Sequence, residues 1–185
     1  MGSYYFLGAQ LPFLIYGQNP PMTSADFKAL AWDLMESRDA VLLDYCTLDP
    51  DPEEDPSQRS DSRIPSEFIK RWREWERSLR LNLARGRSVK LKRDGTVDAP
   101  EFPSDAVLAA KNALTMDSPL EAELLIDKAR WDAIESFQGI DSFNENAMYA
   151  YLLKLLLMER RAAFDIEEGN AEYKALYTAI LGEAK

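Results

Sequence analysis

The stretch IPSEFIKRWREWERSLRLNLARGRSVKLKR, residues 64–93, decides the fold class of this chain. Pro65 and Ser66 are typical of a helix start. Large apolar side chains then recur every three or four residues, which is the period of one helix face. These apolar residues are Phe68, Trp72, Trp75, Leu79 and Leu83. The spacing predicts a long amphipathic helix that buries this stripe against a core.

A second stripe on the same predicted helix is basic, and it comprises Lys70, Arg73, Arg77 and Arg80. Eleven basic residues against three glutamates give residues 63–93 a local charge of +8, so the rest of the chain carries −18. Such asymmetry is typical of a surface that meets a charged partner. Two interpretations remain open. The four side chains bind an acidic face on another protein, or they pair with this chain's own acid, including Glu74, Glu76 and residues 51–55.

Helical patterns also fill the segments on both sides of this stretch. Thr23 or Ser24 is a plausible N-cap, and Ser118 with Glu121 forms a capping box around Pro119. We expect helices over residues 22–37, 38–48, 104–114, 118–137, 143–169 (ending at Gly169) and 170–184. Strand-like alternation is scarce; at most, residues 3–10 or 87–93 supply a short strand. The sequence therefore predicts an all-α, multi-helix bundle with no more than a short N-terminal strand.

The chain has 185 residues, which fits one domain. Residues 1–48 hold an apolar segment and helices that we expect to pack on the core. Residues 49–63, DPDPEEDPSQRSDSR, contain three prolines and no large apolar residue, so we expect a mobile acidic loop. Residues 64–185 form the main helical bundle in this interpretation.

The N-terminal stretch MGSYYFLGAQLPFLIYGQNPPMT, residues 1–23, is apolar, and the first charged residue is Asp26. A secretory signal needs a basic start and an unbroken apolar core. A membrane-spanning helix needs about 20 predominantly apolar residues. Gln10, Pro12 and Gly17 interrupt the run, so we expect it to fold onto the protein core without inserting directly into a membrane.

Composition narrows the chemistry that the chain can perform. It contains no histidine and one cysteine, Cys46, which excludes Ser–His–Asp catalysis, internal disulfides and multi-cysteine zinc sites within these residues. A formal net charge of −10 argues against general nucleic-acid binding and against adhesion to anionic lipid. We expect a noncatalytic, cytoplasmic protein with no cofactor and no catalytic residue.

One acidic cluster has regular spacing: Glu121, Glu123 and Asp127. Glu123 and Asp127 lie four residues apart, so both face one side of the predicted helix. A carboxylate-bridged metal site needs further ligands from a facing helix, where the sequence offers Glu159 but no histidine. Solvated or salt-bridged acid is the default interpretation, and an acid pair for metal binding or glycoside hydrolysis is the alternative.

Three segments resemble known families. In the helix at 118–137, Pro119, Glu123, Asp127 and Trp131 match a Pro-x-x-x-Glu-x-x-x-Asp-x-x-x-aromatic pattern. With the following LLKLLLMERRAAF, this resembles the linker subunit (C or d) of V-type and archaeal-type rotary ATPases. The opening residues Tyr4, Tyr5, Leu7, Leu11 and Pro12, with RWREWERSLRLNLARGR, are similar to a small uncharacterised bacterial family associated with V-type ATPases.

The resemblance implies a noncatalytic adaptor that links the central shaft of a rotary ATPase to its membrane rotor ring. Its partners would be central-stalk and rotor-ring subunits, and it would reach the inner membrane only through them. The alternative is a free-standing scaffold or regulatory protein that binds an acidic partner through the basic residues at 70–80.

Overall fold

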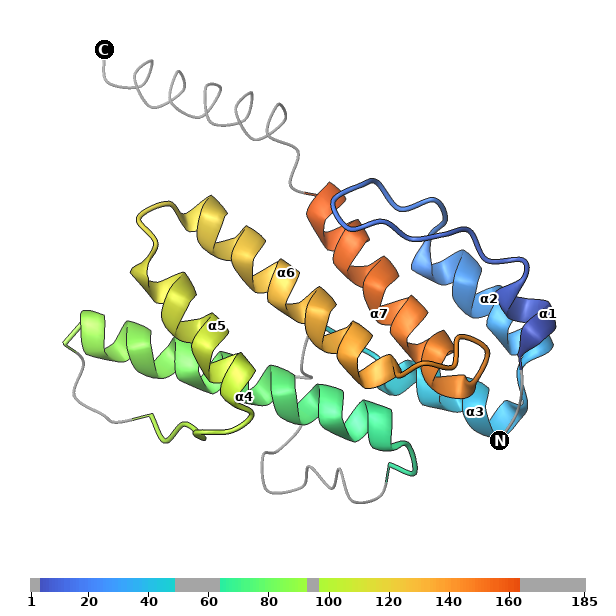
Figure 1. Ribbon diagram of the computed structural model, residues 1–185, viewed down its shortest axis with the longest axis horizontal. Helices are drawn as coiled ribbons and strands as arrows, with labels where there is room; N and C mark the ends of the chain where they lie inside the picture. The colour runs from blue at the N-terminus through green and yellow to red at the C-terminus, as the bar shows by residue number, and fades with distance from the viewer. Residues whose placement is uncertain (1–3, 49–63, 93–96, 164–185) are drawn as a thin grey trace, which may run out of the picture.

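The computed structural model describes residues 4–48, 64–92 and 97–163. Within these ranges it contains seven α-helices, one 3-10 helix and no strand, which confirms the predicted all-α bundle (Figure 1). The elements are α1 (Tyr5–Gly8), α2 (Ser24–Leu34), α3 (Ser37–Ala40), η1 (Val41–Tyr45), α4 (Glu67–Lys90), α5 (Ser104–Thr115), α6 (Pro119–Gln138) and α7 (Glu145–Ala162).

Four helices lie side by side in the order α5, α6, α7 and α2, and α4 runs along α5 and α6 (Figure 1). The short helix α1 packs beside α2, and the segment between α1 and α2 lies over this end of the molecule. Buried side chains from residues 4–48 and from residues 64–163 belong to one hydrophobic cluster.

The predicted helix starts are confirmed by their capping hydrogen bonds. The side chain of Thr23 accepts from the amide of Asp26, and that of Ser118 accepts from the amide of Glu121. Ser66 caps α4 in the same way. Each cap satisfies an amide that a helix terminus otherwise leaves without a partner. Three predictions concern residues outside the described ranges. They are the end of the last long helix at Gly169, the helix at 170–184 and the loop at 49–63.

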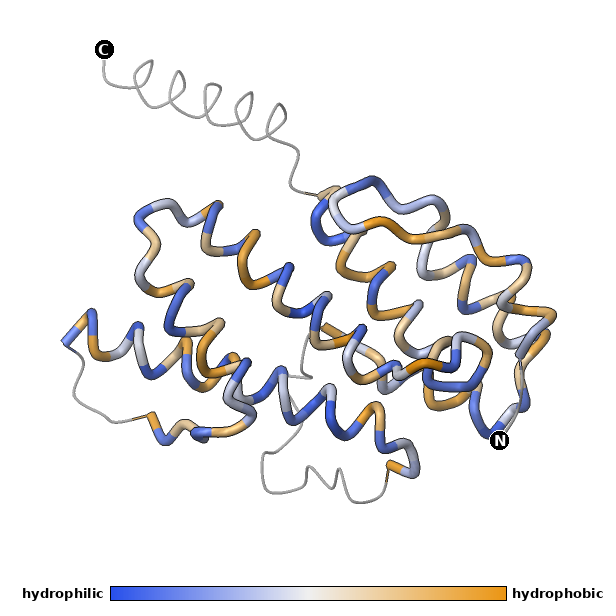
Figure 2. The backbone as a smooth tube through the Cα atoms, viewed as in Figure 1, coloured by the Kyte–Doolittle hydropathy of each residue, from blue (hydrophilic) through white to orange (hydrophobic). Residues whose placement is uncertain are grey.

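The apolar stripe of α4 forms much of the core, as predicted. Trp72 and Trp75 are each 1% exposed and their rings stack with centroids 5.9 Å apart, while Leu79 is completely buried. Figure 2 shows hydrophobic and hydrophilic residues alternating along the longer helices, as expected of helices with one buried face. Burial of two indole rings makes α4 a central element of the packing.

The structure corrects two local expectations. Residues 4–10, the described part of the first candidate strand, contain no strand, because Tyr5–Gly8 is one turn of helix. Residues 87–90 of the second candidate belong to α4. Tyr4 and Leu7 lie three residues apart and are both buried, which suits a helical turn and not the alternation of a strand. The predicted helix at 38–48 is instead two short elements, α3 and η1, that end at Tyr45.

No helix in the described ranges combines the length and the apolar character that crossing a bilayer needs.

Candidate functional site

The four basic residues predicted to bind a partner do not share one environment. Lys70 and Arg73 are partly exposed and Arg77 is exposed, all on the side of α4 away from its tryptophans. Arg80, by contrast, turns towards the protein: its Nε donates to Glu76 Oε1 at 2.7 Å, and its Nη2 donates to the Leu48 carbonyl. The interpretation as an internal pairing surface therefore holds for Arg80. For Lys70, Arg73 and Arg77, internal pairing and partner binding both stay predictions.

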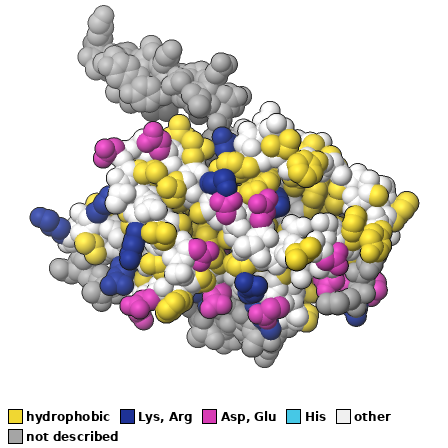
Figure 3. Space-filling model, viewed as in Figure 1, with side chains coloured by type: hydrophobic (Ala, Val, Ile, Leu, Met, Phe, Trp, Pro, Cys, Tyr) yellow, Lys and Arg dark blue, Asp and Glu magenta, His cyan; other side chains and the backbone are white. Residues whose placement is uncertain are grey.

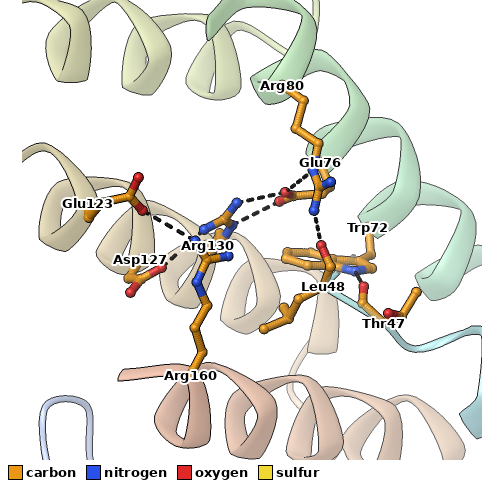
Figure 4. Close-up of polar contacts among 9 residues, drawn as sticks. All are labelled: Thr47, Leu48, Trp72, Glu76, Arg80, Glu123, Asp127, Arg130 and Arg160. Atoms are coloured by element: carbon orange, nitrogen blue, oxygen red, sulfur yellow. Dashed lines mark hydrogen bonds and ion pairs between the residues drawn. The ribbon is translucent and has the colours of Figure 1, made fainter. Parts of the chain in front are cut away.

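Glu76 is the centre of a buried charge cluster that joins α4 to α6. We use the term charge cluster for Glu76, Arg80, Asp127 and Arg130. Arg130 is 4% exposed and binds Glu76 through two hydrogen bonds, Nε to Oε2 at 3.0 Å and Nη2 to Oε1 at 2.8 Å. The same guanidinium donates through Nη1 to Asp127 Oδ1 at 3.1 Å. Figure 4 shows Arg130 lying between the two carboxylates.

Burial and pairing act in opposite directions on these groups. Burial raises the pKa of Glu76, but hydrogen bonds and charge from Arg130 and Arg80 outweigh it, so the pKa of Glu76 lies below its ordinary value. For Asp127, burial is the larger effect and its pKa is raised despite the Arg130 contact. Burial acts to lower the pKa of Arg130, but the carboxylates of Glu76 and Asp127 raise it by more. The pKa of Arg130 therefore lies above its ordinary value, and the side chain stays charged.

A second ion pair continues from the charge cluster towards α7. Arg160 Nη2 lies 3.4 Å from Glu123 Oε2, so α6 and α7 are also joined by opposite charges (Figure 4). Glu123 and Asp127, the predicted carboxylate pair, thus each accept from a different arginine. This agrees with the salt-bridged interpretation of the pair.

Another set of polar contacts fixes the N-terminal residues to the helices. The Tyr4 hydroxyl donates to Asp39 Oδ2 at 2.5 Å, and the Tyr149 hydroxyl donates to the Asp39 carbonyl at 3.2 Å. The Tyr4 amide also donates to the Phe143 carbonyl at 2.6 Å. Burial is the largest of several influences that raise the pKa of both tyrosines, so both hydroxyls keep their protons and act as donors.

The described hydrogen bonds of the charge cluster join its own members, apart from the one that Arg80 donates to the Leu48 carbonyl. The guanidinium of Arg130 uses all its described hydrogen bonds on Glu76 and Asp127. Among the residues with described positions, no group of three or more His, Cys, Asp or Glu is arranged to hold a metal ion. The arrangement fixes the position of α6 relative to α4, because separating the buried partners would leave a charge in the interior without compensation.

Arg130 is not among the candidate residues that the sequence pattern indicated. One local pattern could have indicated that Arg130 is buried. Asp127, Arg130 and Ile134 are spaced by three and four residues, so they share one face of the helix, and Trp131 is adjacent to Arg130 in the sequence. An arginine among otherwise apolar positions of a helix face, with an acid three residues before it, is a candidate for a buried ion pair. Its partner Glu76 is 54 residues away, and no local pattern indicates it.

Comparisons with known proteins add no relative: no protein-family model, no curated protein and no solved structure matches this chain.

Proposed function

We propose that this protein is a noncatalytic adaptor of a V-type rotary ATPase, which links the central shaft to the membrane rotor ring. In this role it is a cytoplasmic protein that meets the membrane only through its partners. The proposal rests on the resemblance of three segments to the linker subunit and to the ATPase-associated bacterial family. Such an adaptor transmits force through a rigid body and needs no catalytic group.

The observation that carries the proposal is the position of the four matching residues on α6. Pro119 opens the helix, and Glu123 pairs with Arg160 on α7. Asp127 pairs with the arginine that also holds α4, and Trp131 is 4% exposed. Glu123 and Asp127 of the pattern therefore hold α6 between α7 and α4. This supports the proposal that the bundle is built in the same way as in the linker subunit that the pattern resembles.

The proposal is tested by purifying the tagged full-length protein from cells that produce it naturally and identifying the proteins that accompany it. Central-stalk or rotor-ring subunits of a V-type ATPase are the expected partners. ATP-driven ion pumping is then measured in cells that lack the protein. Loss of coupling between ATP hydrolysis and pumping is expected, and an ATPase that assembles and couples normally without the protein would overturn the proposal.

The second candidate is a free-standing scaffold or regulatory protein that docks an acidic partner. The observation that favours it is the outer part of the basic stripe: Lys70 and Arg73 are partly exposed and Arg77 is exposed, in a chain of net charge −10. Long-range attraction between such a face and an acidic protein speeds association and weakens with salt.

A charge-reversal variant separates the two candidates. Lys70, Arg73 and Arg77 are changed to Glu together, and Arg80 is kept because it holds buried Glu76. The control reverses three other exposed basic residues, Arg85, Lys92 and Lys111. Loss of partner capture in the first variant alone supports the docking role of the basic stripe. Equal capture by both variants contradicts it.

A further inference from the structure

The segment between α1 and α2 passes over α7 and reaches α6 (Figure 1). We call residues 12–18 of this segment the strap. The Tyr151 hydroxyl of α7 donates to the Pro12 carbonyl at 2.8 Å, and the Tyr16 hydroxyl donates to the Leu124 carbonyl of α6 at 3.1 Å. Two tyrosine hydroxyls therefore fasten the strap to the helices, and only one of them belongs to the strap itself.

The Tyr16 ring packs against three side chains of α6 and α7. Lys128 Nζ lies 5.7 Å and Arg161 Cζ lies 5.3 Å from the ring centroid, and the ring meets Trp131 edge-on with centroids 5.5 Å apart. A cation over an aromatic face is a modest attraction at a site that water reaches. Trp131 is only 4% exposed, so Tyr16 helps to keep water from an indole ring of α6.

The backbone of the strap is held much less firmly than its tyrosine. Within the described part of the chain, the amides of residues 13–17 donate no hydrogen bond, and the turn after them is closed by the Gln18 amide, which donates to the Ile15 carbonyl at 3.2 Å. Leu14 is 8% exposed, but Phe13 and Ile15 are 86% and 46% exposed. Figure 3 shows hydrophobic side chains on the surface at this end of the molecule. A segment with so few buried contacts and backbone hydrogen bonds is of the kind that opens locally.

The helices under the strap are joined by contacts in which the strap takes no part. α6 and α7 pack against each other, and Lys154 of α7 pairs with Glu135 of α6 at 3.2 Å. α2 is held on α7 by Ser24, whose amide and hydroxyl donate to the two carboxylate oxygens of Glu159 at 2.6 and 2.7 Å. Because none of these contacts depends on the strap, the three helices can stay packed when the strap leaves them.

We propose that the strap opens and closes as a unit while α2, α6 and α7 stay packed, so that the fold contains a latch over Trp131. Opening withdraws Tyr16 from Lys128 and Arg161 and uncovers the indole ring. The contacts that are lost are offset in part by the conformational freedom that the strap backbone regains. The molecule then has two states that differ at one surface, and any ligand of the uncovered surface shifts the balance towards the open state. This motion is independent of any role in a rotary ATPase.

Labelling of single introduced thiols with iodoacetamide tests the proposal, because a buried cysteine reacts only when the structure around it opens. Leu14→Cys reports on the strap, and Phe13→Cys, at the exposed neighbouring position, is the matched control for an unprotected thiol. Peptide mass spectrometry separates each label from that of the native Cys46, which is 3% exposed. We expect Leu14→Cys to react at least about tenfold more slowly than Phe13→Cys. Its rate should barely change with urea below the unfolding transition, since opening exposes little surface.

Removing one fastening of the strap should speed the labelling. Tyr151→Phe deletes the hydroxyl that donates to Pro12 and keeps the ring, whose centroid lies 5.0 Å from that of Phe27. We expect Leu14→Cys to react roughly two- to tenfold faster in this background, which is the range that one hydrogen bond supplies. Tyr45→Phe is the matched control, because Tyr45 is 42% exposed and lies outside the strap, and it should leave the rate unchanged.

Glu76→Gln separates opening of the strap from unfolding of the bundle, because it removes a buried ion pair between α4 and α6. It should leave the labelling rate of Leu14→Cys unchanged, and helical circular dichroism checks that every variant is folded. The proposal would be overturned if Leu14→Cys reacted only as the bundle unfolds, with the urea dependence of global unfolding and the same acceleration by Glu76→Gln. Labelling as fast as that of Phe13→Cys would also overturn it, since the strap would then have no closed state.

Discussion

Glu76 on α4 and Arg130 on α6 form a bidentate ion pair in the protein interior, with N–O distances of 2.8 and 3.0 Å. Both residues are less than a tenth exposed. A planar guanidinium that matches a carboxylate through two parallel hydrogen bonds fixes distance and orientation together. The pair therefore sets how α4 and α6 dock, and its removal has the clearest expected effect on stability.

We expect Glu76→Gln to lower the free energy of unfolding by about 3–5 kcal/mol at pH 7, because removing one partner leaves a buried charge poorly compensated. Urea unfolding followed by circular dichroism measures the change. The control is Glu74→Gln, an exposed residue of the same helix, for which the expected change is within about 0.5 kcal/mol. Equal effects of the two substitutions would contradict a special role for the Glu76–Arg130 pair.

The pH dependence of the Glu76 effect has a defined sign. Its pKa in the folded protein lies below the ordinary value of 4.5. The pair therefore contributes its full stability above that ordinary value and loses it as the pH falls through the lowered pKa. The difference between the unmodified chain and Glu76→Gln should shrink below about pH 4.5. A difference that stays constant down to the acid unfolding limit would show that the charge of Glu76 is not responsible.

Asp127 should behave in the opposite way, because its pKa in the folded protein is raised above 3.8. Its proton uptake stabilises the folded state at low pH, and this contribution is lost as the pH rises through the raised pKa. We expect Asp127→Asn to remove that pH dependence and to change stability at pH 7 by no more than about 1 kcal/mol, since relief from burying a charge offsets the weaker bond to Arg130.

Urea unfolding of Asp127→Asn at a series of pH values between 7 and the acid limit is the measurement. Asp132→Asn serves as the control, since Asp132 is an exposed residue of the same helix that pairs with Lys128. A loss at pH 7 as large as that of Glu76→Gln would contradict the unequal roles of the two carboxylates.

Gly86 lets α4 and α5 approach closely. An added Cβ would overlap Leu114 Cδ1 and lie 3.3 Å from Leu114 Cγ. Alanine in a helix interior is better than glycine by about 1 kcal/mol, but overpacking costs about 1–3 kcal/mol. We expect Gly86→Ala to destabilise the unmodified chain and to stabilise a chain that already carries Leu114→Ala. A double-mutant cycle measures this coupling, and the same sign of effect in both backgrounds would refute the close contact.

Tyr4→Phe removes the hydroxyl that donates to the Asp39 carboxylate. We expect a loss of about 1.5–3 kcal/mol in the free energy of unfolding, because a hydrogen bond to a charged group is lost at a buried site. Tyr5→Phe is the matched control, since the Tyr5 ring is 62% exposed and its described contact with Phe143 is made by the ring alone. Similar losses for the two would indicate that the Tyr4 hydroxyl does not stabilise the protein.

The local signals in the sequence were sufficient for the longer helices α2, α4, α5, α6 and α7, but not for α1, α3 and η1. Thr23, Ser66 and Ser118 begin helices because a hydroxyl can cap amides within one turn, and the tryptophans of α4 are buried because their spacing puts them on one face. These effects act over a few residues, so they can be recognised before the chain is folded. The all-α class follows from them.

Tertiary structure alone decided which charged residues became internal. Arg80 and Arg77 belong to the same basic stripe, yet Arg80 turns towards Glu76 while Arg77 is exposed. Arg130 meets Glu76 only because α6 docks on α4, and Tyr4 meets Asp39 only because the N-terminal turn packs near α3 and α7. Contacts between residues 35 or 54 positions apart depend on how whole helices pack, and that packing is set by the complete core rather than by any local pattern.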